Sequence, residues 1–588
     1  MVGTEPPSIG ELGPVEDVMD GGYLGLPVAA GDLTHGRFIA QVAERYPQNE
    51  AMVFGDRRLT YEQLQAEVRA FGKGLLALGV TKGSKVAVML GNRPEFVVAA
   101  YGAALVGAVA VPVSTLAAAD ERDYVLGHCD ASVLVTQASL GDRRFVDELV
   151  ANHPGIVDAE PGRIAVARFP HLRRIVCVGS VPGPRSVEGW EDVVAAGASV
   201  DDAVLDAAAA SVVPSDDALI IYTSGTTAHP KAVLHRHRGP VVQSWRWKEQ
   251  LGLDQSDRVW SPFPFFWTAG LAFVLGGTLA SGACFVCQEA FEAGEALELL
   301  ERERVTTVHT FPHTAAALVE HQDAHKRDLS SLRRVAQDSA LRRLARIEGD
   351  PGDPRAAYGL TETFTICTSI PSNSPLELRE TTHGVTLPGM AIRIVDPDSG
   401  EPLGVGETGE IAVRGVTLMR GYYKVAPEEC FDDDGWFRTK DSGHLDEAGY
   451  LHWHGRLSGL IKTAGANVSP AEVEAAVANW GRLKLASVVG VPHPRFGETV
   501  VLCAVRSLDP VSAEDLTGHL RGVLASYKVP RRVLFFDDEE LTYTGSQKVR
   551  LEDVRSLAAR RLAEADDEWA QFLREEHTEL VAAPVEGW

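Results

Sequence analysis

Along most of the chain, apolar residues recur either with the spacing of one helix face or in short continuous runs that are typical of buried strands. Residues 59–79 (LTYEQLQAEVRAFGKGLLALG) have helical spacing, with Thr60 placed as an N-cap and Gly79 as a C-terminal stop. The apolar run 85–90 predicts a buried strand, and the pattern continues with a helix at 94–105 and strands at 131–136, 174–179, 218–222, 283–287 and 306–310. Strands separated by helical lengths predict parallel sheets that helices cover on both faces.

The pattern changes after about Gly384. Short segments with glycine turns (MAIRIVD, GETGEIAVRG, GYLHWHGR) predict a small, mainly antiparallel region. A boundary is expected near residue 456, beyond which Ser469 and Pro470 begin a helix as N-cap and first helical residue, with strands at 486–491 and 499–505.

These patterns predict an α/β fold: a large N-terminal domain of parallel α/β sheets plus a small antiparallel β region, and a small α/β C-terminal domain. The expected bounds are an N-terminal extension at 1–35, the large domain at 36–456, and the small domain at 457–588 with a helical tail after 550.

Composition and net charge argue against some classes of binding partner and site. The chain has 588 residues and a formal net charge of −25, from 81 acidic and 56 basic side chains. Such a charge repels a nucleic-acid backbone, and no basic patch offsets it, so we expect no nucleic-acid partner. Any phosphate site must therefore supply its own cations or a metal ion. Cys284 and Cys287 form a CxxC inside an apolar run without a second pair, which favours a buried strand over a zinc site.

Residues 96–119 carry no charge and would be long enough to cross a bilayer. Their Ala, Gly and Val content and Pro112 favour a buried helix followed by a buried strand, with a membrane span as the alternative. The acidic N-terminus lacks the apolar core of a secretory signal. We expect a cytoplasmic protein without an integral membrane segment, and a homodimer stays open because the sequence does not decide the oligomeric state.

The most specific motif follows the strand at 218–222. The sequence YTSGTTAHPK brings hydroxyls, glycine-exposed backbone N–H groups and a lysine into one short loop, which is typical of a nest for an anion. The spacing of a Walker A loop is absent. On composition alone a polar turn explains the motif equally well. Its members are Thr223, Ser224, Gly225, Thr226, Thr227 and Lys231.

Four further motifs carry side chains suited to nucleotide chemistry. In AYGLTET, Tyr358 offers an aromatic face and Glu362 a hard oxygen ligand for Mg²⁺. Asp441, after a strand, could accept both hydroxyls of a ribose. Residues 462–474 (KTAGANVSPAEVE) and 541–549 (LTYTGSQKV) are glycine-containing loops with a lysine. Each motif by itself also fits a turn or a solvated surface loop.

Together and in this order, the five motifs resemble those of the class I adenylate-forming enzymes: acyl- and aryl-CoA synthetases, luciferases and the adenylation domains of peptide synthetases. The resemblance covers residues 35–550. In this family a carboxylate attacks the α-phosphorus of ATP bound with Mg²⁺, giving an acyl-adenylate and pyrophosphate. Transfer to a thiol, usually that of coenzyme A, follows. The resemblance therefore implies ATP, Mg²⁺ and coenzyme A.

Because this family rotates its small C-terminal domain about a hinge, the resemblance implies that the C-terminal domain is mobile. It also implies roles for individual residues. Lys548 aligns with the catalytic lysine, Thr361 would contact the α-phosphate, and Glu362 would bind Mg²⁺. Asp441 would take the ribose hydroxyls, with Arg456 close to them. The implied ATP and AMP site comprises Thr223, Ser224, Gly225, Thr226, Thr227, Lys231, Gln337, Asp338, Ser339, Tyr358, Gly359, Thr361, Asp441, Arg456 and Lys548.

The acyl pocket would be lined by residues around PFPFFWTAG and HTFPH, where no aspartate stands to hold an α-amino group. An apolar aromatic or aliphatic acid is therefore expected. The pocket residues are Phe265, Phe266, Trp267, Gly270, His309 and Gly384, and the hinge and coenzyme A residues are Ser458, Lys462 and Gly465.

Several positions depart from the family pattern. Ala228 and Ala232 stand where glycines are usual in the phosphate loop, Lys440 replaces the glycine before Asp441, Ser458 replaces the hinge aspartate, and Gln547 replaces the glycine before the catalytic lysine. None of these changes removes a charged catalytic group, so adenylation is expected to survive.

The leading hypothesis is an AMP-forming acid:CoA ligase. One alternative keeps adenylation but passes the acyl group to the pantetheine of a carrier protein or to an amine. The other is a non-catalytic homologue that binds a nucleotide or an acyl ligand.

Overall fold

A computed structural model describes residues 23–180, 183–223, 230–336, 339–348, 357–370, 374–459, 461–463, 466–507, 510–524, 528–541, 549–565 and 567–582. The chain forms two compact units, residues 1–391 with 413–437 and residues 392–412 with 438–588. The predicted domain bounds at 36–456 and 457–588 stay a prediction, because units defined by packing need not end where functional domains do.

The largest sheet of the first unit has eight strands, and its central strands are parallel, as the alternation of strands and helices predicts. An antiparallel hairpin and a third short strand extend it at one edge. The order is β19 (Gly421–Tyr422), β9 (Lys231–Arg236), β8 (Asp217–Thr223), β4 (Val109–Pro112), β3 (Lys85–Met89), β5 (Ala131–Gln137), β6 (Arg174–Val178) and β7 (Val187–Gly189).

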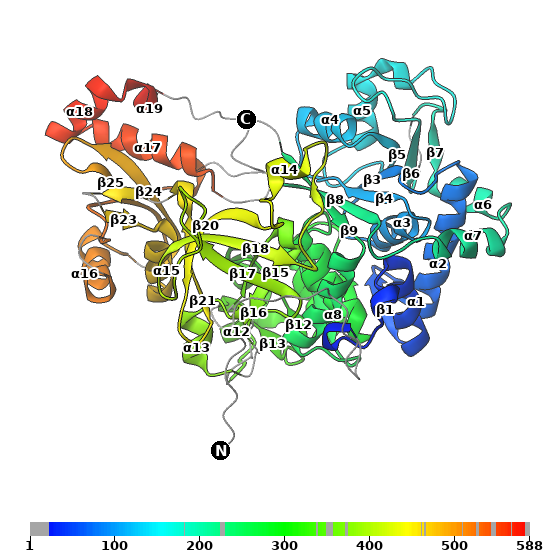
Figure 1. Ribbon diagram of the computed structural model, residues 1–588, viewed down its shortest axis with the longest axis horizontal. Coiled ribbons are helices and arrows are strands. Elements are labelled where there is room, and N and C mark those ends of the chain that lie inside the picture. Colours follow the sequence, from blue (N-terminus) through cyan, green and yellow to red (C-terminus); the bar gives the residue numbers. More distant parts are fainter. Residues whose placement is uncertain are drawn as a thin grey trace. The chain divides into compact units, whose positions relative to one another are not determined.

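Helices cover both faces of this sheet (Figure 1). α3 (Pro94–Leu105), buried along its whole length, packs on β3 and β4, and α2 (Tyr61–Ala77) packs on α3. On the opposite face, α4 (Ala119–His128) and α5 (Phe145–Asn152) form one apolar core with alternate residues of β3. The predicted cap of α2 is confirmed, because Thr60 and Gln63 form a reciprocal capping box.

A six-stranded sheet and a three-stranded antiparallel sheet complete the first unit. Cys284 and Cys287 lie buried on β11 (Cys284–Cys287), which confirms the strand predicted there. The strand predicted at 306–310 is only two residues long. The six-stranded order is β13 (Arg334–Val335), β12 (Thr307–Val308), β10 (Arg258–Trp260), β11 (Cys284–Cys287), β1 (Glu50–Phe54) and β2 (Arg57–Thr60), and the three-stranded order is β14 (Ala357–Leu360), β15 (Thr365–Ser369) and β16 (Val385–Thr386).

The second unit contains the predicted antiparallel hairpin of β20 (Phe437–Leu445) and β21 (Leu451–Arg456), and the predicted α/β region after residue 456. The bounds of the two units fall within β17, β18 and β20. One sheet has the order β17 (Met390–Val395), β18 (Gly409–Gly415), β20 (Phe437–Leu445) and β21 (Leu451–Arg456), and the other has β23 (Ala466–Val468), β22 (Ile461–Thr463), β25 (Gly497–Arg506) and β24 (Leu483–His493), with β26 (Arg532–Phe536) paired to β25.

Alternate side chains of β24 and β25 serve two separate cores. Val488 and Leu502 belong to one core with α15 (Pro470–Trp480) and α16 (Ala513–Val523), whereas Val489 and Val501 belong to the other with α17 (Leu551–Ala563) and α18 (Glu568–Glu576). Figure 1 shows these two pairs of helices on opposite sides of the sheet. Because successive side chains of a strand point to opposite faces of the sheet, one continuous apolar run contributes to the cores on both faces.

In the described ranges, α17, α18 and α19 (Thr578–Ala582) follow residue 550. Within the described ranges, no helix combines the length and the apolar character that crossing a bilayer requires. The remaining helices are α1 (His35–Arg45), α6 (Trp190–Gly197), α7 (Asp202–Ala210), α8 (Arg238–Leu251), α9 (Gly277–Ser281), α10 (Ala293–Arg302), α11 (Pro312–Glu320), α12 (Ala340–Leu344), α13 (Leu376–Thr381) and α14 (Pro427–Cys430).

A pair of buried histidines joins the start of α1 to the start of α8. The Nδ1 atoms of His35 and His237 lie 3.1 Å apart, and the backbone N–H of His35 donates to Nδ1 of His237 at 3.4 Å. Burial lowers the pKa of His237 from 6.5 to about 3 and lowers that of His35 in the same direction. Both imidazoles are therefore neutral in the folded protein near neutral pH.

This burial predicts a loss of stability in acid. Below pH 6.5 the unfolded chain protonates His237, whereas the folded chain does so only near pH 3, so the free energy of unfolding falls as the pH decreases through this window, by up to about 1.4 kcal/mol per pH unit for this group. His237→Asn keeps an acceptor near the His35 amide but cannot titrate. Denaturant unfolding from pH 7 to pH 5 should therefore show a shallower decrease in the variant.

The control is His325→Asn, which changes an exposed histidine and should leave the slope as in the wild type. Equal slopes for His237→Asn and the wild type would contradict the prediction.

Candidate active site

The loop from Ser224 to Thr227 lies outside the described residues, but both strands that lead into and out of it are described. β8 and β9 form an antiparallel hairpin in which Thr223 pairs with Lys231. The two described ends of the predicted phosphate loop, Thr223 and Lys231, therefore lie opposite each other on neighbouring strands, and both side chains are partly exposed.

The AYGLTET motif forms the end of β14 and the short helix η6 (Thr361–Thr363), and the chain then returns as β15. This reversal needs a glycine, because a Cβ on Gly359 would lie 1.7 Å from the carbonyl oxygen of Thr365. It also needs left-handed backbone at Phe364 (φ 50°) and Thr365 (φ 96°). Positive φ at a β-branched residue is costly and persists only where surrounding contacts enforce it.

Buried side chains from α8 and β9 supply those contacts. His235 Nε2 donates to the Thr361 carbonyl at 2.8 Å, and Trp247 Nε1 donates to the hydroxyl of Thr365 at 2.9 Å. The Gln243 amide donates to the carbonyls of Thr363 and Ile366 at 3.0 and 2.6 Å. Complete burial lowers the pKa of His235 to about 3, so its ring stays neutral. No pattern in the sequence indicates these three residues, because each lies more than a hundred positions from its partner.

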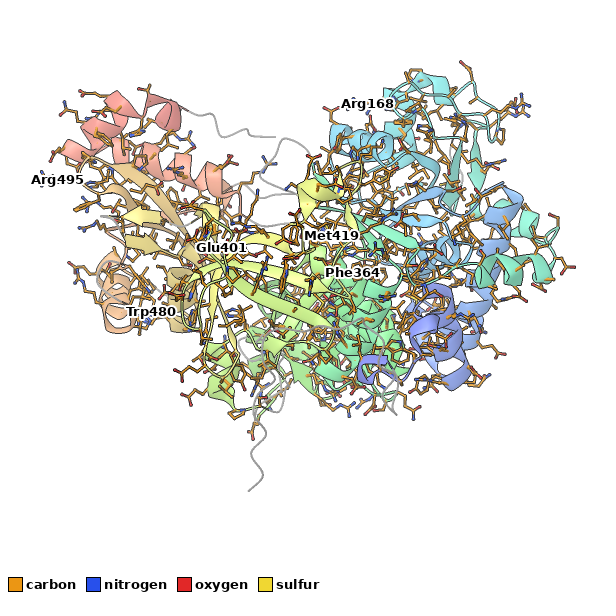
Figure 2. All side chains as sticks on the ribbon, in the orientation of Figure 1. Arg168, Phe364, Glu401, Met419, Trp480 and Arg495 are labelled. Atoms are coloured by element: carbon orange, nitrogen blue, oxygen red, sulfur yellow. The ribbon has the colours of Figure 1, made fainter. Side chains whose placement is uncertain are left out.

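Glu362 is held from a second direction by the chain around β19. The backbone N–H of Met419 donates to the Glu362 carbonyl at 2.7 Å, and the Tyr422 hydroxyl donates to Glu362 Oε1 at 2.6 Å. Figure 2 labels Met419 and Phe364 in this region. Lys231 Nζ lies 5.0 Å from the centre of the Tyr422 ring. Tyr422, which the sequence analysis did not select, thus contacts two predicted residues, Lys231 and Glu362, and the predicted Thr361 directly precedes Glu362 in the chain.

The arrangement around Glu362 suits a cation that also binds substrate oxygens. In the described ranges, no three His, Cys, Asp or Glu side chains come together in a way that could hold a metal by themselves. Mg²⁺ in nucleotide enzymes typically takes only one or two protein carboxylates and completes its shell with phosphate oxygens and water. A single partly exposed carboxylate at Glu362 fits this mode of binding.

Asp441 and Arg456 lie in the second unit and face each other across β20 and β21. Arg456 Nε lies 3.1 Å from Asp441 Oδ1, and the guanidinium also donates to the Thr439 carbonyl. Lys440 has a φ of 61°, which a glycine adopts at lower cost. This conformation is a physical reason for the glycine that the resemblance implies before the aspartate.

The predicted acyl residues lie on a segment packed with aromatic rings. Phe265 and Phe266 are buried, and Trp267 and Phe311 have ring centres 6.1 Å apart. A Cβ on Gly270 would lie 2.0 Å from the Pro264 carbonyl oxygen, so only glycine allows the chain to enter the π-helix η4 (Ala269–Gly276) in this way.

Two aromatic residues that the prediction omitted, Phe273 and Trp247, connect this segment to the rest of the unit. The Phe273 ring lies 4.7 Å from the predicted His309 ring and 4.4 Å from the Trp247 ring, measured between centres. Gly384 lies on the loop before β16, where its φ of 78° and the close backbone of Ser369 require a glycine. The spacing of apolar residues could not single out Phe273, because nearly every residue of η4 is apolar.

The other predicted residues are placed only in part. Ser339 precedes α12, Ser458 belongs to the turn η7 (Leu457–Gly459), and Lys462 lies on β22. Gln337, Asp338, Gly465 and Lys548 lie outside the described residues.

Comparison with known proteins gives the family. Residues 39–423 match the family model described as AMP-binding enzyme, and residues 472–548 match the model for the AMP-binding enzyme C-terminal domain. The chain belongs to the AMP-binding enzyme family. The resemblance inferred from the five motifs is thereby confirmed.

Named relatives of this AMP-binding enzyme are CoA ligases and a related synthetase. It is 32% identical over 523 residues to indoleacetate–CoA ligase of Aromatoleum aromaticum, covering 88% of this chain and 96% of the relative. The anthranilate CoA ligase AuaEII has a TM-score of 0.74 at 25% identity, covering 90% of this chain and 98% of that chain. The amide bond synthetase McbA from Marinactinospora thermotolerans has a TM-score of 0.70 at 26% identity, covering 89% and 99%.

The geometry at Gly359 gives a prediction for the AMP-binding enzyme. Gly359→Ala forces the backbone of β14 away from Thr365, which displaces Tyr358 and Glu362 together. Because a displacement of about 1 Å at reacting groups costs roughly 100-fold in rate, exchange of labelled pyrophosphate into ATP should fall at least that far.

The matched control is Gly518→Ala on α16, where nothing lies within 4 Å of the added Cβ, and exchange should stay at the wild-type rate. Wild-type exchange in Gly359→Ala would mean that this backbone contact does not set the position of the site.

Proposed function

We propose that this enzyme is an AMP-forming acid:CoA ligase that acts on an apolar carboxylic acid. Membership of the family supports the use of ATP, and similarity to named CoA ligases over about nine tenths of the chain supports coenzyme A as acceptor. The observation that carries the proposal is that Tyr422 contacts both Lys231 and Glu362, two residues that lie far apart along the chain within the first unit.

The first half-reaction joins the acid to AMP. The carboxylate of the acid attacks the α-phosphorus of ATP, and pyrophosphate leaves. Lys231 and the hydroxyls of the phosphate loop stabilise the charge on the leaving pyrophosphate. Mg²⁺, when bound at Glu362, neutralises charge on the phosphate oxygens.

Two residues of the second unit also have proposed roles toward the nucleotide. Asp441 accepts hydrogen bonds from the ribose hydroxyls, and its position is fixed by the ion pair with Arg456. Lys548 stabilises the charge shared between the incoming carboxylate and the α-phosphate, which is electrostatic catalysis that needs no proton transfer. Its assignment rests on the match of TYTGSQKV to the family motif.

The second half-reaction passes the acyl group to coenzyme A. The thiol sulfur attacks the acyl carbon and AMP leaves, which gives a thioester. Ser458 stands at the hinge position, and Lys462 and Gly465 belong to the loop proposed to serve this step. Seven cysteines, all without a disulfide partner, agree with a reducing compartment, and we propose the cytoplasm.

The acid itself is proposed to be apolar, and an aromatic acid is favoured. Residues 262–270 carry no charged side chain that could hold an α-amino group. The Phe263 ring contacts those of Phe273 and Phe311, and Phe273 contacts His309, with ring centres 4.3 to 6.1 Å apart. Such surfaces stabilise planar rings by stacking and by burial of apolar area.

One experiment tests the proposal and its main rival. The purified enzyme is incubated with ATP, Mg²⁺ and either benzoate, phenylacetate, indole-3-acetate, octanoate or phenylalanine, and pyrophosphate exchange is measured. Exchange is expected with one or more of the first four acids and not with phenylalanine. Adding coenzyme A should then give an acyl-CoA, detected by mass spectrometry.

Two outcomes would overturn parts of this proposal. Adenylate without thioester, together with amide formation when an amine is added, would favour the amide-forming alternative suggested by the similarity to McbA. No exchange with any acid would favour a homologue that binds ligands without catalysis.

The role of Lys548 has a separate test. Lys548→Ala should lower adenylate formation by orders of magnitude, because the charge of the transition state loses its counter-ion, while ATP still binds. Pyrophosphate exchange measures the first effect and calorimetry the second. An unchanged exchange rate would rule out this assignment.

A further inference from the structure

Two consecutive tyrosines after Gly421 make contacts with different parts of the first unit. Tyr422 pairs with Val233 in the sheet, so it lies beside β9, the strand that starts at Lys231. Consecutive side chains of an extended segment point in opposite directions. Accordingly, Tyr422 reaches Glu362, whereas the Tyr423 hydroxyl donates to Asp130 Oδ2 at 2.9 Å.

Tyr422 touches two oppositely charged groups with different parts of its side chain. Its hydroxyl donates to Glu362 Oε1 at 2.6 Å, and its ring face meets the ammonium of Lys231 at 5.0 Å from the ring centre. The ring is itself supported by Phe437, whose centre lies 6.3 Å away. In the described part of the chain, Lys231 and Glu362 form no direct ion pair within 4.0 Å.

These two contacts have distinct physical consequences. A hydrogen bond from a hydroxyl to a carboxylate is short and strong, and it fixes the rotamer of the glutamate while Oε1 is engaged. The second carboxylate oxygen is then oriented by the same bond. The contact between the ammonium and the ring holds Lys231 without neutralising it, because the ring carries no net charge. A direct pair between Lys231 and Glu362 would instead use up both charges.

We propose that Tyr422 is a positioning residue of the phosphate site, which orients Glu362 for Mg²⁺ and keeps Lys231 available for the phosphates of ATP. The inference rests on the proposed function in its assignment of Lys231 and Glu362. In this proposal the Tyr422 hydroxyl orients the carboxylate that binds the metal, and the Tyr422 ring holds Lys231. The two roles can be tested separately.

Removing the hydroxyl tests the first part. In Tyr422→Phe the ring stays while Glu362 loses its hydrogen-bond donor. The ratio of the ATP affinity with Mg²⁺ to the ATP affinity without it should therefore fall about tenfold, as expected for the loss of a hydrogen bond to a charged group. Calorimetry of ATP binding without any acid, with Mg²⁺ and with EDTA, measures this gain. Affinity for metal-free ATP should equal that of the wild type.

Removing the ring tests the second part. Tyr422→Leu frees Lys231 to pair with Glu362, so affinity for metal-free ATP should fall as well, which it should not in Tyr422→Phe. Adding Glu362→Gln to Tyr422→Leu removes the competing carboxylate and should restore the affinity for metal-free ATP. This rescue would not occur if the leucine only disturbed the fold.

Tyr423→Phe is the matched control, because it removes the neighbouring hydroxyl from the same strand region on the side of Asp130. It should leave both affinities unchanged. Thermal unfolding of each variant measures stability independently. The proposal is overturned if Tyr422→Phe keeps the full Mg²⁺ gain, or if Tyr423→Phe loses as much of it.

The design separates this inference from the proposed function. If the wild type exchanges no pyrophosphate with any acid but binds ATP with a gain from Mg²⁺, the proposed ligase function fails while the calorimetric comparison still decides the role of Tyr422. If exchange occurs and the gain is equal in all variants, only the role of Tyr422 fails.

Discussion

Three buried side chains, His235, Gln243 and Trp247, hold the strained reversal that carries Thr361 and Glu362. Their hydrogen bonds end on backbone carbonyls and one hydroxyl of that reversal, in a region shielded from water. In such surroundings a hydrogen bond is strong and an unmade one is costly, so the contacts can offset the left-handed backbone at Thr365. The groups of this motif that are proposed to contact the phosphates therefore depend for their position on these hydrogen bonds.

Charge places a second constraint on the site. A chain with a net charge of −25 must attract a polyanionic substrate against its own field, so each local cation matters. Lys231 contacts a neutral ring at Tyr422, and Glu362 is occupied by the hydroxyl of the same residue. Neither charge is neutralised by the other within the described residues, which the proposed binding of phosphates and a metal ion requires.

Long apolar runs made most of the fold predictable. Strands such as β3 and β5 and helices such as α2 follow the expected bounds within a few residues, because burial of their apolar positions leaves one stable arrangement. Short or uniformly apolar segments were harder: β12 has only two residues, and η4 is a π-helix that no periodicity distinguishes from an α-helix. Gln243 was missed because a polar residue on a helix is usually exposed, whereas here it is fully buried.

The sequence by itself determined the class of fold, the order of the motifs and the family, because these depend on local periodicity and on short runs of residues that stay together in the chain. It also placed Lys231, Glu362 and Asp441 among the candidates. Only the tertiary structure decided that Tyr422 contacts both Lys231 and Glu362, and that His235 donates to the carbonyl of Thr361, the residue before Glu362. Contacts between residues 60 or more positions apart arise from the packing of strands and helices and leave no pattern along the chain.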